Sequence, residues 1–395
     1  MAGTQTLSPS QVSAANMAAR QTILHNADMQ TIVSNTGSFV IAAGDYTQPT
    51  LQLQPACVGL ELGFVLRLQM TITNNSGATI TLTPWGVSNM LRNINYSDPQ
   101  SVARTNVDGK FLHFLMSQKQ GSPMSATTSP DATFGAGWGT WASATSINGA
   151  SYAPTTIASG GTATIWHTFY LPLAKSHADL TGAVWGQLQN AFQTLNITMS
   201  KAAQICTATG VNPTDAIYQG GTGSVAITAA SYRLQLVSYT LNLPMRNGQY
   251  IVPLQDIGTV YAASQTTATG LAANQDFLVN YPASWSYESV TLIYDNAGLN
   301  PGTDVNNMTI ATAAGTEFGR FTPSDMCWMA GNRMGTTPPY GTYYFSHHQK
   351  PISTALYGSI GVKFNPLTVN AGANLRLMYE YTAPLQLFSA VGLTM

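Results

Sequence analysis

The alternation of apolar and polar residues in LRLQMTIT, residues 66–73, restricts the fold more than any other short stretch of this chain. Every second residue is leucine, methionine or isoleucine, and the residues between them are arginine, glutamine or threonine. Successive side chains of a strand point to opposite faces, so a period of two predicts a half-buried β-strand. The following NNSG predicts the turn that ends it. Threonine, serine, glycine, asparagine and aromatic residues dominate the remainder, which favours an antiparallel all-β sandwich or barrel over βαβ units.

A long-range internal repeat adds a second restriction. SYRLQLVSYTLNLP, residues 231–244, resembles NLRLMYEYTAPLQL, residues 374–387, with Arg233 and Arg376 at matching positions. Earlier segments match in the same order: TIWHTFY pairs with GTYYFSHHQKPIS, and QTLNITM pairs with GSIGVKFNP. This spacing is too long for a solenoid repeat and is typical of a duplicated domain. We predict two copies of one β-sandwich unit, joined near residue 244.

The N-terminal segment carries a helix signal. Ser8 is a candidate N-cap, Pro9 occupies the first helical position, and Gln11 can complete a capping box. We predict a helix from Ser8 to about Asp28. Four small or aliphatic residues follow at helical spacing, and they are Val12, Ala15, Ala19 and Ile23, whereas Arg20 is expected on the polar side. The sequence leaves open whether this stripe packs on the chain's own domain or faces a partner or a membrane.

A second helix start is expected at TPSDMCWMAGNRM. Thr322 precedes Pro323, and Asp325 stands where a capping residue would accept hydrogen bonds. Small helices are thus predicted in connections of an otherwise all-β fold.

The low charge of the chain restricts the classes of molecule that it can bind. Charged residues make up 8% of the sequence, and 15 basic residues nearly cancel 16 acidic ones, whereas an ordinary soluble domain has about 25% charged residues. Such a chain has no electrostatic means of collecting phosphate backbones, so we expect no specific nucleic acid as a partner. Low charge also leaves little repulsion between copies, which suits a protein packed against many others of its kind.

The cysteines and the start of the chain indicate a cytoplasmic origin. Cys57, Cys206 and Cys327 are far apart and odd in number, which favours reduced, partly buried thiols over disulfides or a zinc site. The start MAGTQTLSPSQ lacks the pattern of a signal peptide. The most apolar region, ACVGLELGFVLRLQM, is interrupted by Glu61 and Arg67 and is too short for a membrane span. We therefore expect synthesis in a cytoplasm and retention there until assembly.

The adjacent histidines of YYFSHHQKPI are the first candidates for a chemical site. His347 and His348 fall at the end of the segment that matches TIWHTFY, where neighbouring side chains of a strand point to opposite faces. They cannot hold one ion together unless the strand breaks there. His167, in the counterpart segment, has no ligand partner nearby in sequence. We predict no metal site here.

Other candidate sites are equally weak. Neither a GxSxG, an HExxH nor a Walker phosphate loop occurs. The alternating glycines of FGAGWGTW follow no strand and precede no helix. Asp295 and Asp304 could bind calcium, but aspartate side chains also stabilise turns, and this simpler interpretation accounts for both residues. The sequence thus predicts no catalytic, cofactor-binding or metal-binding residues, no cofactor and no enzymatic activity.

One alternative function remains from the residues alone. The glycine- and serine-rich segment 121–154 carries Trp138 and Trp141, which could form a sugar-stacking platform. With scattered Asp and Asn residues, this would make the chain a carbohydrate-binding or carbohydrate-active β-sandwich protein.

Several collinear stretches resemble the major coat protein of tectiviruses, the tailless phages with an internal membrane. The similarity runs from about residue 60 to 382, with loops between the matching stretches. These stretches are TITNN, HFLMSQKQGSP, DLTGAVWGQLQ, GVNPTDAIYQGGTG, NGQYIVPLQDIGTVY, GLAANQDFLVNY, YDNAGLNPGTDVN, KPISTALYGSIGVKFNPLTVN and YEY. No single motif is diagnostic, but so many in register are specific.

The resemblance implies a double jelly roll, in which two eight-stranded β-sandwiches stand in tandem. It implies a structural capsid protein forming trimeric, pseudo-hexagonal capsomers of an icosahedral bacteriophage with an internal membrane. The implied partners are the chain itself as a homotrimer, neighbouring capsomers, minor capsid and vertex proteins, and the viral membrane through the N-terminal helix. Its place is the virion shell after synthesis in the host bacterial cytoplasm. The expected segments are an N-terminal helix or arm (1–35), two jelly rolls (36–244 and 245–385) and a C-terminal arm (386–395).

Overall fold

The computed structural model describes most of the chain. The described residues are 8–39, 50–55, 57–83, 85–120, 151–176, 178–186, 192–201, 204–207, 215–220, 225–282, 285–296, 304–312, 315–334, 341–347 and 351–384. The segment with Trp138 and Trp141, His348 and the predicted C-terminal arm lie outside them.

Eight strands of the first half form two antiparallel sheets, one ordered β1-β14-β3-β9 and the other β2-β11-β5-β6. The strands are β1 (Asp28–Phe39), β2 (Thr50–Leu53), β3 (Leu60–Asn74), β5 (Leu91–Ser97), β6 (Ala103–Val107), β9 (Thr162–Pro172), β11 (Thr194–Met199) and β14 (Val225–Asn242).

Eight strands of the second half repeat this arrangement, in the orders β17-β25-β19-β22 and β18-β24-β20-β21. They are β17 (Thr259–Ala268), β18 (Phe277–Asn280), β19 (Ser286–Asp295), β20 (Val305–Thr312), β21 (Glu317–Phe321), β22 (Thr342–Ser346), β24 (Ile360–Pro366) and β25 (Asn374–Pro384).

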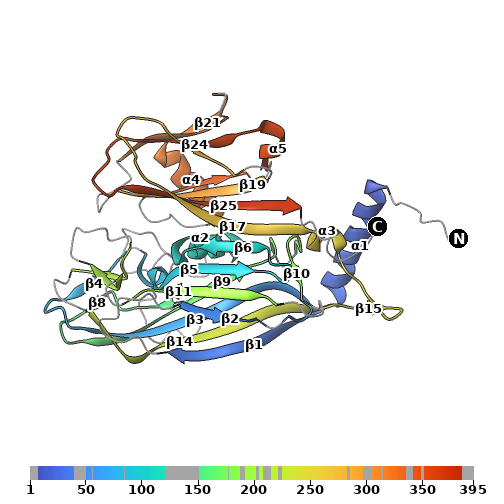
Figure 1. The fold of residues 1–395 in the computed structure, drawn as a ribbon, viewed down its shortest axis with the longest axis horizontal. Helices are drawn as coiled ribbons and strands as arrows, with labels where there is room; N and C mark the ends of the chain where they lie inside the picture. The colour runs from blue at the N-terminus through green and yellow to red at the C-terminus, as the bar shows by residue number, and fades with distance from the viewer. Residues whose placement is uncertain are drawn as a thin grey trace.

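The two halves therefore share one topology. If these strands are counted one to eight along each half, both halves pair in the orders 1-8-3-6 and 2-7-4-5. An eight-stranded double sheet of this kind is a jelly roll. The predicted repeat is confirmed strand by strand, because the matching segments form β14 and β25, β9 and β22, and β11 and β24. Figure 1 shows the two jelly rolls packed side by side along their long axes.

Helices and short strands fill the connections. The helices are α1 (Pro9–Asn26), α2 (Gly109–Gln120), α3 (Leu254–Ile257), α4 (Pro323–Met334), α5 (Thr354–Tyr357) and the 3-10 helix η1 (Gly86–Met90). The short strands are β4 (Ile80–Leu82), β7 (Ser151–Tyr152), β8 (Thr156–Ile157), β10 (Val184–Trp185), β12 (Cys206–Thr207), β13 (Tyr218–Gln219), β15 (Met245–Arg246), β16 (Gln249–Tyr250) and β23 (Ile352–Ser353). The all-β fold with small connecting helices is confirmed.

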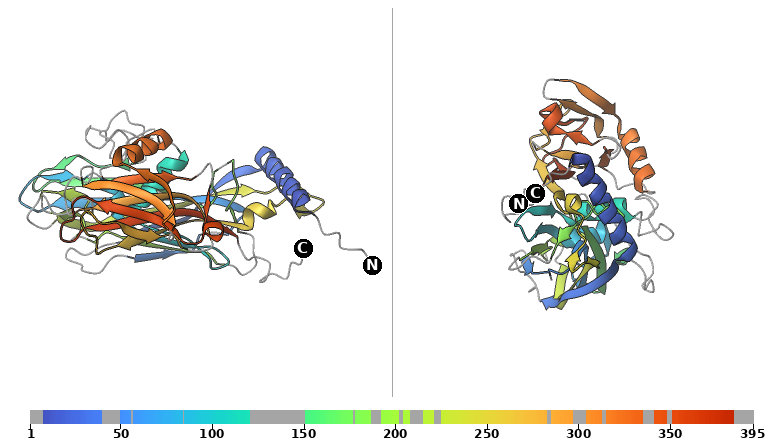
Figure 2. Two further views of the ribbon diagram at one scale, coloured as in Figure 1. Left: turned by 90° about the horizontal axis from the view of Figure 1, so that it is seen from above. Right: turned by 90° about the vertical axis from the view of Figure 1, so that its right-hand side faces the viewer.

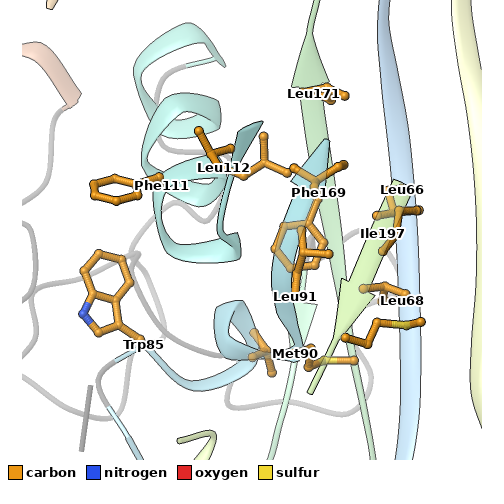
Figure 3. Packing of buried hydrophobic residues seen from close by; sticks show 14 of the residues in the cluster. Leu66, Leu68, Trp85, Met90, Leu91, Phe111, Leu112, Phe169, Leu171 and Ile197 are labelled. Atoms are coloured by element: carbon orange, nitrogen blue, oxygen red, sulfur yellow. The ribbon is translucent and has the colours of Figure 1, made fainter. Parts of the chain in front are cut away.

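The predicted alternation at 66–73 is confirmed in β3. Leu66, Leu68, Met70 and Ile72 are at most 1% exposed, and the residues between them face outward. The apolar side of β3 packs with β9, β11 and helix α2 to form the core of the first jelly roll, which Figure 3 shows from close by. A second cluster fills the second jelly roll.

The predicted capping of α1 is confirmed, but its packing differs from the expected stripe. The Ser8 side chain accepts from the Gln11 amide and the Gln11 side chain accepts from the Ser8 amide. Asn16 and Ile23 are the buried residues of the helix, whereas Ala15 is exposed. Arg20, expected on the polar side, is half-buried because it pairs with Asp256 of α3. The helix thus docks on its own chain, at the end where α3 and β15 lie (Figures 1 and 2).

No helix among the described residues is long and apolar enough to cross a membrane.

Candidate functional site

His347 and Asp304, two of the candidate residues from the sequence, make contacts that hold the backbone in place. His347 directly follows β22, and its backbone amide donates to the Glu288 carbonyl at 2.7 Å. Asp304 accepts from the Asn296 side chain at 3.0 Å, and its backbone carbonyl accepts from Leu367 and Thr368. These contacts tie loops together, which supports the turn-stabilising interpretation of this aspartate.

The described parts of the chain were compared with the side-chain groupings that bind metal ions. They contain no group of three or more His, Cys, Asp or Glu side chains that could hold an ion. Cys57 and Cys206 are half-buried, and neither forms a disulfide within the described residues.

The most elaborate polar arrangement lies between the two jelly rolls. Strand β6, the fifth of the first jelly roll, pairs in parallel with β17, the first of the second, through Thr105 with Ala263 and Asn106 with Ser264. This pairing joins one sheet from each half into a single nine-stranded sheet. The junction is therefore built from backbone hydrogen bonds as well as side chains.

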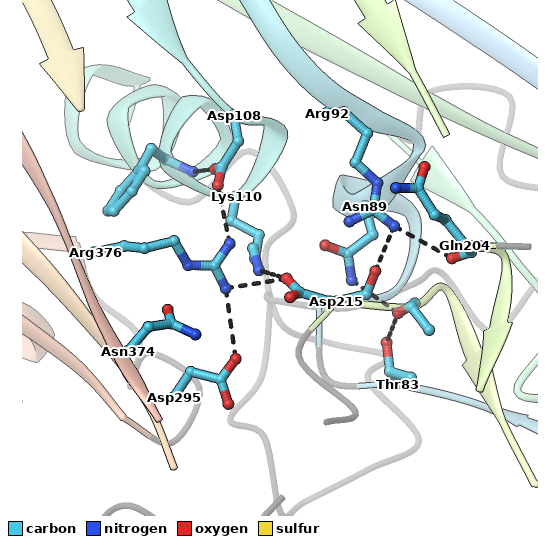
Figure 4. A network of polar contacts seen from close by, with 12 residues as sticks. Thr83, Asn89, Arg92, Asp108, Lys110, Gln204, Asp215, Asp295, Asn374 and Arg376 are labelled. Atoms are coloured by element: carbon cyan, nitrogen blue, oxygen red, sulfur yellow. Dashed lines mark hydrogen bonds and ion pairs between the residues drawn. The ribbon is translucent and has the colours of Figure 1, made fainter. Parts of the chain in front are cut away.

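An ion-pair network crosses this junction beside the paired strands (Figure 4). Arg376 of β25 is 3.3 Å from an oxygen of Asp108, 3.0 Å from Asp215 and 3.9 Å from Asp295. Lys110 of α2 donates to the same Asp215 oxygen at 2.8 Å. Asp108 and Lys110 belong to the first half and Arg376 and Asp295 to the second. Charges that are individually costly to bury thus neutralise one another across the contact.

Burial and charge shift the pKa values in this network. Desolvation, together with the nearby Arg376 cation, lowers the pKa of Lys110 to about 8. Burial alone would raise the pKa of Asp215, but the charges of Lys110 and Arg376 hold it well below its usual range. Asp215 is therefore ionised and anchors both cations.

A second buried pair strengthens the junction. Arg104 of β6 contacts Asp98 at 2.6 Å, with both side chains at most 2% exposed, and donates to the Gly182 carbonyl at 2.6 Å. Gly182 has φ +91°, and a Cβ there would lie 2.3 Å from the Cβ of Tyr261 in β17. Only glycine permits this close approach.

Apolar contacts complete the junction. The outer face of the second jelly roll's β17-β25-β19-β22 sheet packs into the core cluster of the first jelly roll through Ala263, Ile293, Tyr344 and Met378. The ring of Phe114 in α2 meets the ring of Tyr344 in β22 with 5.5 Å between centroids. The two halves thus share one continuous apolar interface.

Two buried polar clusters were not found from the sequence. His113 and His167 stack at 5.1 Å in the first jelly roll, and desolvation lowers the pKa of His113 to about 3, so the imidazole is neutral. Glu61, fully buried, accepts from Gln193, and burial raises its pKa to about 8. The two residues of each pair, His113 with His167 and Glu61 with Gln193, are more than fifty residues apart in sequence, so only the alternating pattern around His167 and Glu61 could have signalled burial.

Comparisons with known proteins agree over nearly the whole chain. The P3 major capsid protein N-terminal family matches residues 2–238, and the P3 major capsid protein C-terminal family matches residues 258–391. The chain belongs to the P3 major capsid protein family. The resemblance to tectivirus coat proteins is thereby confirmed, and the family's structural role confirms a non-enzymatic protein. Major capsid protein P3 of Enterobacteria phage PRD1 is 33% identical over 392 residues, which span 96% of each chain.

Solved coat-protein structures share the fold of this family member at low identity. The STIV MCP, from Sulfolobus turreted icosahedral virus, superposes with a TM-score of 0.63 at 13% identity and covers 93% of this chain and 100% of that one. The PBCV-1 virus capsid gives a TM-score of 0.53 at 10% identity, with 90% and 94% of the two chains covered. The double jelly-roll fold class is confirmed.

Proposed function

We propose that this P3-family chain is the shell-forming subunit of an icosahedral bacteriophage and assembles as trimeric, pseudo-hexagonal capsomers around an internal membrane. The observation that carries this function is membership of the P3 major capsid protein family over both halves of the chain. The duplicated topology supports a pseudo-sixfold arrangement, since each chain offers two similar units. The low charge of the sequence supports dense packing of copies.

The oligomeric state tests this proposal directly. We expect light scattering after size-exclusion chromatography to give three times the chain mass at micromolar concentration. Closed assemblies of this kind repeat one heterologous contact around an axis, and obligate interfaces typically bury more than about 2,000 Å². A folded, stable monomer at those concentrations would contradict the proposed function.

The boundaries of the two units fit this proposal. We keep the division near residue 244, because β14 ends at Asn242, a β15–β16 hairpin follows, and β17 begins at Thr259. Strand β1 begins at Asp28, so the segment 1–35 contains helix α1 and the start of the first sheet. Residues 386–395 are proposed to contact neighbouring capsomers, and minor capsid and vertex proteins are proposed as further partners of the shell.

The end of the molecule that carries α1 is proposed to face the viral membrane. Exposed apolar side chains gather on three elements at that end, and these are Met17 and Leu24 of α1, Leu254 of α3, and Met245 and Tyr250 of the β15–β16 hairpin. An interfacial helix with such residues can contact the boundary of a bilayer without spanning it.

Point changes test the membrane contact better than truncation, because removing α1 would also unpair the buried Asp256 carboxylate from Arg20. Met17→Glu combined with Leu24→Glu should weaken co-sedimentation with vesicles of bacterial phospholipid and leave the melting temperature unchanged. Leu367→Glu, at a similarly exposed site on the loop after β24, is the matched control. Equal vesicle binding by both variants would argue against the membrane-facing assignment.

A further inference from the structure

Among the described strands, two sheet edges match the two edges that meet in the internal junction. Strand β6, fifth in the first jelly roll, is joined to β17, first in the second. Strand β21, fifth in the second jelly roll, and β1, first in the first, each lie at the end of their sheets. The chain thus has one further fifth-strand edge and one further first-strand edge, the same two kinds of edge that pair in the internal junction.

We propose that a second copy of this chain binds across these edges, with Trp328 of one copy packing on the outer face of the β1-β14-β3-β9 sheet of the next. The contact repeats between chains the one that joins the two jelly rolls within a chain. It rests on the proposed function and assigns the residues of its subunit interface.

Helices α2 and α4 are equivalent elements, which fixes the position of Trp328. Each helix connects the fifth and sixth strands of its jelly roll. Asp108 caps α2 by accepting from the Phe111 amide at 3.0 Å, and Thr322 caps α4 by accepting from the Asp325 amide at 3.3 Å. Counted from these caps, the fourth residues are Leu112 and Met326, and both are fully buried. The helices are therefore in the same register.

The sixth residues after the caps have opposite environments. Phe114 of α2 is fully buried and packs against Tyr344 of the other jelly roll, whereas Trp328 of α4 is 70% exposed. A large aromatic side chain costs free energy when it faces water, and tryptophan is the residue most enriched among interface hot spots. Trp328 thus holds in α4 the position that Phe114 holds in α2, but its ring is exposed where that of Phe114 is packed.

The strand registers identify the surface that would receive Trp328. Arg376 pairs with Ile293, and Arg233, its repeat counterpart, pairs with Gln69. Thr291 lies two residues before Ile293 and is paired with Tyr344. Arg67 lies two residues before Gln69 and is paired with Thr168. Thr168 therefore occupies in the first jelly roll the position of Tyr344 in the second.

That receiving surface has suitable chemistry. Arg67 is exposed and Thr168 half-buried on the same sheet, and an arginine beside an indole contributes a favourable cation–π interaction.

A matched pair of alanine variants tests the proposal. Trp328→Ala should raise the protein concentration at half-dissociation of the oligomer at least tenfold, since truncating a hot-spot tryptophan is among the costliest substitutions in an interface. Phe192→Ala removes another aromatic side chain, 71% exposed, from the first jelly roll, and should stay within about twofold of the parent chain. Both melting temperatures should be unchanged at high protein concentration.

The outcomes separate this inference from the proposed function. An unchanged oligomer in Trp328→Ala, or equal weakening in both variants, would overturn the docking assignment while the capsid role stands. A parent chain that is monomeric at all concentrations would remove the proposed function itself and the interface with it.

Cross-linking identifies the receiving face. A chain carrying both Thr168→Cys and Trp328→Cys should be joined into covalent oligomers by a short bifunctional thiol reagent that spans the space of the removed indole, since a direct disulfide would require Cα atoms within about 7 Å. Each single variant controls for the native cysteines. A ladder in the double variant alone supports the contact, and a ladder absent from it or equal in the single variants contradicts the contact.

Discussion

The two jelly rolls have the same strand order but fill their cores with different chemistry. The first encloses titratable groups, namely the stacked His113 and His167 and the buried Glu61. The second encloses tyrosines around Trp285, whose ring stacks on Tyr381 at 4.0 Å. The hydroxyls of Tyr287 and Tyr294 each donate to a carbonyl, of Pro282 and of Thr368, at 2.6 Å.

This difference shows that the topology does not depend on the identity of the core residues. Alternation along the strands and the order of the connections are common to both halves, whereas the side chains inside are not. Cores tolerate such exchange when volume and pattern are kept. The buried histidines and Glu61 should consequently give the first core a pH dependence of its own, and the tyrosine-lined core of the second should respond to the loss of hydroxyl hydrogen bonds.

Breaking the junction between the halves should have the largest effect. Arg376→Met leaves the carboxylates of Asp108 and Asp215 without this partner, and removing one member of a buried ionic network costs about 3–5 kcal/mol. Calorimetry should show a lower melting temperature, with two separated transitions in place of one. Arg246→Met, on the exposed β15–β16 hairpin, is the control. A melting curve unchanged by Arg376→Met would show that the network does not couple the halves.

The pH dependence of the first jelly roll should follow Glu61. Burial raises its folded pKa to about 8, above the ordinary value of 4.5, so the folded state binds a proton more tightly than the unfolded state. Its contribution to stability is complete below pH 4.5 and is lost as pH rises to 8, by at most about 1.4 kcal/mol per pH unit.

Glu61→Gln should therefore flatten the fall in unfolding free energy between pH 5 and 8, measured by urea titration. The second jelly roll offers a control in Glu317→Gln, an exposed change on β21. An equally steep fall in both variants would rule out Glu61 as the cause.

Two tyrosines sharpen the comparison within the second jelly roll. Tyr287→Phe removes a hydroxyl that donates to Pro282 and should cost about 1 kcal/mol. The Tyr379 hydroxyl is buried, and no hydrogen-bond partner for it occurs in the described part of the chain, so Tyr379→Phe should be neutral or slightly stabilising. Denaturant midpoints of the two variants give the contrast, and equal losses would contradict it.

The smallest effect is expected at the adjacent histidines. Changing His347 and His348 to alanine should alter the unfolding free energy by less than about 0.5 kcal/mol, because His347 follows the end of β22 and is only half-buried. The zinc and copper content of the purified parent chain and of the double variant should be measured together with their melting curves. Stoichiometric zinc or copper that disappears in the double variant would reveal a site there.

The sequence was sufficient for the repeat but not for the junction. Matching segments predicted which strands are equivalent, because an alternating pattern and its turn signals are local properties. Helix α2 was missed, since Asp108 and Gly109 look like a turn, whereas Asp108 caps a helix. The network of Asp108, Asp215 and Arg376 brings together residues more than a hundred positions apart, and nothing local in the sequence marks such a contact.

Glu61 illustrates a related limit. In the sequence it interrupts an apolar run, and nothing in that local pattern reveals a buried acid. Its environment is set by Gln193 and Tyr96 on other strands, and burial is a property of the assembled sandwich.

The pairing of β1 with β14 has a consequence for biosynthesis. Asp28 lies opposite Asn242, so the first sheet cannot close until about two hundred further residues have left the ribosome. At about 5–20 residues per second this takes about 10–40 s, during which β3 and β9 can pair while one edge of β3 stays without its neighbour. We expect nascent chains stalled before residue 225 to be cleaved readily by protease, and chains stalled well beyond Asn242 to be protected; equal cleavage of both would show that closure does not wait for β14.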